Sequence, residues 1–152
     1  MPAVKRLRFT TIIEAPVSRV YALMIDPESY RNWTSAFAEG STYEGSWAQG
    51  QQIRFLSPSG DGMVAEIVEN RCNEFISIRH LGFVAQGIVD TDSEAVRAWA
   101  PAYENYSFEA VPQGTRVVVD QDITDEFEGF MKETWPKALA RLKALCEGQG
   151  AA

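Results

Sequence analysis

The chain has 152 residues, of which 45% are hydrophobic and 23% are charged, so it has the composition of an ordinary globular protein. Its length fits one domain, which we expect over residues 1–147, followed by a frayed tail at 148–152. The formal net charge of -7 argues against a nucleic-acid partner and against an anionic membrane surface. No apolar run resembles a signal peptide or approaches the roughly 20 residues of a membrane span. These features predict a cytoplasmic protein that is not embedded in a membrane.

The first quarter of the chain predicts one strand and two short helices. Residues 4–14 interleave basic and threonine side chains with apolar ones, as strands do. Pro16 opens a short amphipathic helix, which stops at Asp26. The carboxylate of Asp26 can then cap a second helix that reaches about residue 32.

Short alternating runs separated by turn residues predict a meander of antiparallel strands after the second helix. The runs are residues 41–47, 52–56, 63–70, 74–83, 103–110 and 115–124. A segment of about 20 residues between Phe83 and Ala102 is longer than a hairpin needs. Asp92 and Ser93 within it precede what looks like a capped helical turn.

The last stretch, Asp125–Cys146, predicts a long amphipathic helix. Its apolar residues recur at steps of three and one, which places them on one face of a helix. Because such a face must pack on something apolar, we expect the helix to lie on the sheet. In that arrangement the aromatic first half faces a cavity between helix and sheet, and Leu139, Leu142 and Leu145 anchor the second half.

The order of elements and several local phrases resemble the SRPBCC superfamily, the helix-grip fold of START lipid-transfer domains and the birch-pollen allergen. Within it the chain is most similar to the Aha-type branch, named for the activator of the ninety-kilodalton heat-shock-protein ATPase. The phrases that carry the resemblance are residues 13–21, 26–30 with Trp33, 44–47 with Gly50, Ile53 and Phe55, 63–69, 76–78, 115–117 and the closing helix with Trp135. The resemblance implies an α+β fold with a curved antiparallel sheet of about six or seven strands, two short helices after the first strand and a long C-terminal helix across the sheet.

Aromatic and aliphatic side chains from separate elements converge between helix and sheet in this arrangement. They fill a core or line a pocket for an apolar ligand, which typically has aromatic walls and few polar groups. The candidate ligand-binding residues are Trp33, Phe55, Ile78, His80, Phe83, Trp99, Tyr106, Phe108, Phe127, Phe130, Met131 and Trp135.

His80 is the only histidine and shares a strand face with Ile76 and Ile78. It is therefore either a buried neutral histidine with a hydrogen-bond partner in the core or a residue that orients a ligand. Glu66 enters the cavity if the face of Val64 and Val68 points inward, and otherwise it is solvated. No nucleophile and base set is visible, and no pair of histidines or cysteines has the spacing of metal ligands. We expect neither a cofactor nor a metal.

Members of the superfamily include ligand carriers, polyketide cyclases and aromatases, and co-chaperones, so three functions stay open. The leading hypothesis is a non-enzymatic protein that binds a small apolar or amphipathic molecule. The second is a cyclase or aromatase in which His80, Glu66 or Tyr106 moves a proton. The third is a protein-interaction domain with an unidentified partner, such as a heat-shock ATPase.

Overall fold

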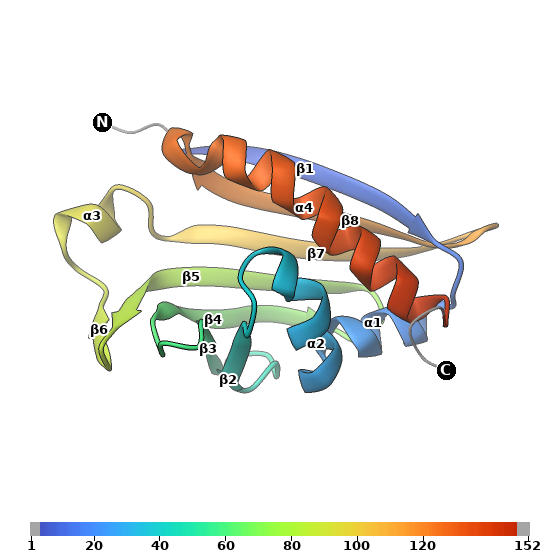
Figure 1. Cartoon of the computed structure of the whole chain (residues 1–152), viewed down its shortest axis with the longest axis horizontal. Helices are drawn as coiled ribbons and strands as arrows, with labels where there is room; N and C mark the ends of the chain where they lie inside the picture. Colours follow the sequence, from blue (N-terminus) through green and yellow to red (C-terminus); the bar gives the residue numbers. More distant parts are fainter. Residues whose placement is uncertain (1–3, 149–152) are drawn as a thin grey trace.

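The computed structural model describes residues 4–148, in which one antiparallel sheet is crossed on one face by the C-terminal helix (Figure 1). We call this face of the sheet the inner face. The strands are β1 (Val4–Ile13), β2 (Thr42–Gly45), β3 (Gln52–Leu56), β4 (Gly62–Arg71), β5 (Phe75–Ala85), β6 (Ile88–Asp90), β7 (Ala102–Val111) and β8 (Gly114–Thr124). The helices are α1 (Val17–Ile25), α2 (Pro27–Trp33), the 3-10 helix η1 (Thr34–Ala36), α3 (Glu94–Arg97) and α4 (Asp125–Cys146).

The order of the strands explains how α4 reaches the inner face. The sheet runs β1-β8-β7-β5-β4-β3-β2, with the short β6 paired to β5 beside this path. The first strand therefore lies next to the last, and α4 leaves the end of β8 and returns across the sheet toward α1 and α2 (Figure 1). The α+β helix-grip fold is confirmed. The strand β6, inside the long segment before β7, was not predicted.

The two early helices form where the sequence predicts them, and Asp26 sets their boundary. Its Oδ2 accepts hydrogen bonds at 3.1 Å from the backbone N–H groups of Glu28 and Ser29, which otherwise have no partner in the first turn of α2. The indole N–H of Trp33 donates to the carbonyl of Met24 at 3.1 Å. This bond ties the end of α2 to α1 and holds the indole ring in the core.

A β-bulge in β5 changes which of its side chains face inward. Val64 pairs with Gly82 and Ala65 pairs with His80, so Leu81 has no partner across the ladder. Strict alternation from His80 would put Phe83 on the outer face, but the extra residue brings it opposite Met63 on the inner face. Gly82 is required there because a Cβ atom would lie 2.0 Å from the carbonyl oxygen of Asp90 in β6.

The apolar stripe of α4 is buried in its middle and second half and exposed at its beginning. Trp135 and Leu142 have 2% and 0% of their surface exposed, whereas Phe127 and Phe130 have 48% and 47%. The end of the helix is held by Arg19 of α1, whose Nε donates to the carbonyl of Cys146 at 2.7 Å. The guanidinium thus satisfies a helix C-terminus that has no further partner within the helix.

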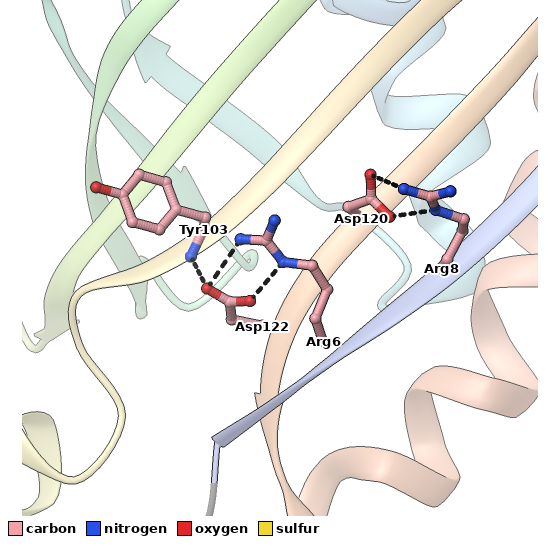
Figure 2. A network of polar contacts seen from close by, with 5 residues as sticks. All are labelled: Arg6, Arg8, Tyr103, Asp120 and Asp122. Carbon is pink, nitrogen blue, oxygen red and sulfur yellow. Dashed lines mark hydrogen bonds and ion pairs between the residues drawn. The ribbon is translucent and has the colours of Figure 1, made fainter.

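The outer face of the sheet carries charged pairs in register between β1 and β8. Arg6 lies opposite Asp122, and its Nε is 2.9 Å from Oδ1. Arg8 lies opposite Asp120 at 2.7 Å, and the backbone N–H of Tyr103 also donates to Asp122 (Figure 2). Such cross-strand pairs help to fix the register of the first strand on the last.

Helices within residues 4–148 are all too short or too polar to cross a lipid bilayer. Of the predicted tail, Gly148 lies in a turn that follows α4, and residues 149–152 lie outside the described part of the chain.

We expect the two halves of α4 to differ in their contribution to stability. Leu142→Ala should lower the free energy of unfolding by about 2 to 5 kcal/mol, because it leaves a cavity in the core. Phe127→Ala, at a half-exposed position, should cost within about 1 kcal/mol. Urea denaturation of both variants measures the difference, and equal losses would contradict this division of the helix.

Candidate functional site

A buried carboxylate on the inner face is the centre of the candidate site. Glu104 of β7 has a side chain that is only 12% exposed. Its Oε1 accepts hydrogen bonds from His80 Nε2 at 3.0 Å and from Gln121 Nε2 at 3.4 Å. Its Oε2 accepts a hydrogen bond from the hydroxyl of Tyr106. Three side chains from three neighbouring strands therefore converge on one carboxyl group.

The groups around Glu104 are themselves held in place. The indole N–H of Trp135 in α4 donates to Gln121 Oε1, which directs the amide nitrogen of Gln121 toward Glu104. The imidazole of His80 lies between aromatic rings, with centroid distances of 5.8 Å to Phe55 and 5.6 Å to Trp99. His80 Nδ1 is buried and has no hydrogen-bond partner among the described residues.

Glu104 opens onto a pocket of about 270 Å³ between α2, α4 and the sheet, which we call the α2 pocket. Its floor includes Glu104, Tyr106 and Gln121. Aromatic side chains form much of the wall, and the mouth includes small polar residues. The wall residues are Tyr30, Trp33, Phe37, Phe55, Phe130 and Trp135, and the mouth residues include Ser41, Thr42 and Ser57.

A second pocket of about 710 Å³ lies between α3, the end of β8 and the start of α4, and we call it the α3 pocket. Its walls include the stacked rings of Phe83 and Trp99, whose centroids are 4.9 Å apart. Met63, Gln121 and Met131 line both pockets. The two pockets therefore adjoin, with these three side chains at their shared boundary.

The predicted candidate residues divide among the two pockets and the core. Those that line the α2 pocket are Trp33, Phe55, Tyr106, Phe130, Met131 and Trp135. Those that line the α3 pocket are Phe83, Trp99, Phe127 and Met131. Four of the candidate residues line the α2 pocket and also belong to the buried core: Trp33, Phe55, Tyr106 and Trp135.

Ile78, His80 and Phe108 are buried but line neither pocket. His80 packs near the rings of Phe55 and Trp99 and contacts Glu104, but it does not itself line a pocket. Phe108 packs edge-on against Tyr21 of α1 at 5.6 Å, at an end of the sheet that is filled by core. Ile78 lies in the same core and has none of its surface exposed.

Glu66 lies on the outer face, where its Oε1 is 2.5 Å from Arg79 Nη2. Ala65 and Ile67 form the inward face of β4. Of the two orientations that the sequence left open, this is the one in which Glu66 points away from the cavity. Residues 4–148 contain no group of three histidine, cysteine, aspartate or glutamate side chains that could hold a metal ion.

Sequence reasoning missed Glu104 and Gln121, although the pattern that reveals them is present. Glu104 has the same strand parity as Tyr106 and Phe108, which were predicted to converge on the inner face. The ladder places Glu104 opposite Gln121, so the two must share that face. A polar residue at an inward position of an otherwise apolar strand face is the signal.

Comparison with known proteins identifies the family. The protein family described as "Activator of Hsp90 ATPase homolog 1-like protein" matches this chain over residues 14–147. The chain belongs to this family. The match spans everything from the end of β1 to the end of α4, so it includes every residue of the cluster around Glu104.

Solved structures share the fold of this family member at low sequence identity. A putative uncharacterized protein from Rhizobium leguminosarum has a TM-score of 0.72 at 18% identity, with 97% of each chain covered. The Aha1 dimer from Colwellia psychrerythraea has a TM-score of 0.70 at 18% identity, covering 94% of this chain and 96% of that one. DynU16, a putative protein in the dynemicin biosynthetic locus, has a TM-score of 0.68 at 16% identity. The match covers 95% of this chain and 48% of DynU16. No curated protein sequence matches the chain significantly.

The buried phenols at the site have perturbed acidities. Burial raises the pKa of Tyr106 well above its ordinary value of 10.0, and the negative charge of nearby Glu104 raises it further. Burial and the same carboxylate also raise the pKa of Tyr30, which lines the α2 pocket. Both phenols are therefore held neutral, and Tyr106 keeps the proton that it donates to Glu104.

These shifts predict a loss of stability at alkaline pH. Because the folded-state pKa of each phenol exceeds the unfolded value, the stabilisation is fully present below about pH 10 and is lost as the pH rises further. Tyr106→Phe should make this loss less steep, and it should cost about 1 to 3 kcal/mol at neutral pH by removing a donor to Glu104. Urea denaturation between about pH 8 and pH 11 measures both effects. An unchanged pH dependence in Tyr106→Phe would contradict the assignment.

Proposed function

We propose that this protein binds a small, largely apolar molecule in the α2 pocket and anchors a polar group of that molecule at Glu104. The observation that carries the proposal is the aromatic wall around a single buried polar cluster. Ligand sites characteristically combine apolar walls with a few convergent polar groups that set orientation. The membership of the family and the shared fold are consistent with this use but do not choose a ligand.

The polar cluster supports binding more than a purely structural role. A carboxylate in a core is costly to bury, and replacing such groups by apolar ones is often neutral or stabilising. Here three strands each supply a donor to Glu104, yet the carboxyl group still borders the pocket. An anchor for a ligand explains why a charged group stands at the floor of an otherwise aromatic space.

The size of the site depends on the boundary between the pockets. The α2 pocket alone, at about 270 Å³, is slightly smaller than the usual range for small-molecule sites. Met63 and Met131 at the boundary are unbranched and adapt readily to a neighbour. A ligand whose apolar end displaces them can extend toward the α3 pocket.

A cyclase or aromatase is the second candidate, and one observation favours it. Glu104 accepts a hydrogen bond from the neutral phenol of Tyr106 at the pocket floor, which places an acceptor and a donor side by side where a substrate carbonyl could bind. In this hypothesis the hydroxyl of Tyr106 turns from Glu104 to donate to the carbonyl, and the oxygen of Glu104 that it leaves accepts a proton from the adjacent carbon. Conversion of a bound poly-ketone, detected by mass spectrometry, would distinguish it from simple binding.

The binding hypothesis is tested with a panel of sterols, fatty acids, flavonoids, polyketides and aromatic amines, scored by thermal shift and then by calorimetry. We expect at least one class to stabilise the protein and to lose most of its affinity in Ser57→Trp, which fills the mouth of the α2 pocket. No stabilisation by any class would contradict the proposed function.

Ser59→Trp is the matched control. The hydroxyl groups of Ser57 and Ser59 are 2.8 Å apart, so either substitution removes the same hydrogen bond. Of these two serines, Ser57 lines the α2 pocket and Ser59 does not. Equal loss of affinity in both variants would place the ligand elsewhere.

A further inference from the structure

The charges around both pockets have one sign. Among the described residues that line the pockets, none is lysine, arginine or histidine. Carboxylates occur in both linings: Asp61 and Glu104 in the α2 pocket, and Asp122, Asp125 and Glu126 in the α3 pocket.

Most of these carboxylates are paired with a basic side chain or exposed to solvent, and Glu104 is the exception. Asp122 pairs with Arg6 on the outer face, as Figure 2 shows, and Asp125 pairs with Lys5 at 3.3 Å at the surface. Glu126 is exposed. The side chain of Glu104 is only 12% exposed, and among the described residues no lysine or arginine lies within ion-pair distance of it. Its negative charge is therefore offset by hydrogen bonds and not by a fixed cation.

The aromatic walls add potential of the same sign. The face of an aromatic ring is negative and attracts a cation placed over it, most strongly when water is excluded. Tyr30, Trp33, Phe37 and Phe55 line the pocket above Glu104. A positive group inside the α2 pocket thus meets a largely buried carboxylate among aromatic rings, whereas a carboxylate or phosphate meets repulsion with no lysine, arginine or histidine in the lining.

From this arrangement we propose that the ligand of the α2 pocket is an organic cation, a hydrophobic amine whose ammonium group contacts Glu104. This inference rests on the proposed binding function and narrows it to one chemical class. The ammonium N–H groups donate to the carboxylate, which has no lysine or arginine partner among residues 4–148. The apolar body of the amine lies among the aromatic rings.

The experiment uses three probes that share one aromatic skeleton: naphthylethylamine, naphthylethanol and naphthylacetate. Calorimetry with the wild-type chain should rank the amine tightest and the acid weakest, with the amine favoured over the alcohol by about tenfold or more. Because this ranking needs no substitution, it holds as a test even if a site variant fails to fold.

Glu104→Gln and Glu66→Gln form the matched pair of variants. Glu104→Gln should weaken the amine by about tenfold and leave the alcohol within about twofold, because only the charge at the pocket is removed. Glu66→Gln removes a carboxylate from the outer face of the same sheet and should change neither affinity. The preference for the amine should also persist from about 0.15 M to about 0.5 M salt, since buried charges are screened less than exposed ones.

The outcomes separate this inference from the function on which it rests. Equal affinity for amine and alcohol, or tightest binding of the acid, overturns the cation and leaves a neutral or anionic ligand in the pocket. If the preference for the amine survives Glu104→Gln and disappears at high salt, it comes from the net charge of the protein. That result also overturns the inference. Binding of none of the three probes overturns both the cation and the proposed pocket.

Discussion

The packing of Trp135 is the contact on which the other parts of the structure depend. Its ring lies 4.9 to 6.2 Å from the rings of Phe9, Trp33, Phe37 and Tyr106, so one side chain joins α4 to β1, α2, β7 and the segment after η1. A buried indole N–H needs an acceptor, and Gln121 supplies it. Because the carbonyl end of the Gln121 amide is used in this way, its nitrogen is left to donate to Glu104. The docking of the helix and the orientation of the polar cluster are therefore one arrangement.

The sequence was sufficient to predict the order of elements apart from η1 and β6, because local chemistry marks many of the boundaries. Asp26 caps α2, Ser93 caps α3, and Gly114, with a positive φ, begins β8 after the hairpin turn. These signals act over a few residues and are readable in a single chain. The stripe of α4 likewise predicted which face is buried, although it could not show that Phe127 and Phe130 remain half exposed.

The parts that could not be predicted depend on pairing between distant strands. The bulge at Leu81 appears only when β4 and β5 are aligned, and it reverses the side on which Phe83 lies. Strand parity places Glu104 on the same face as Tyr106 and Phe108, but only the ladder shows that Gln121 lies opposite it on that face. Local periodicity gives the faces of a strand, but the register decides which face is inward. The candidate site is thus a property of the assembled sheet more than of any motif.

The same bulge links the segment between β5 and β7 to the candidate site. With Phe83 turned inward, Trp99 beyond α3 stacks on it with an interplanar angle of 9°. The other neighbour of Trp99 is His80, at 5.6 Å, and His80 in turn donates to Glu104. A wall of the α3 pocket therefore also supports the carboxylate at the floor of the α2 pocket.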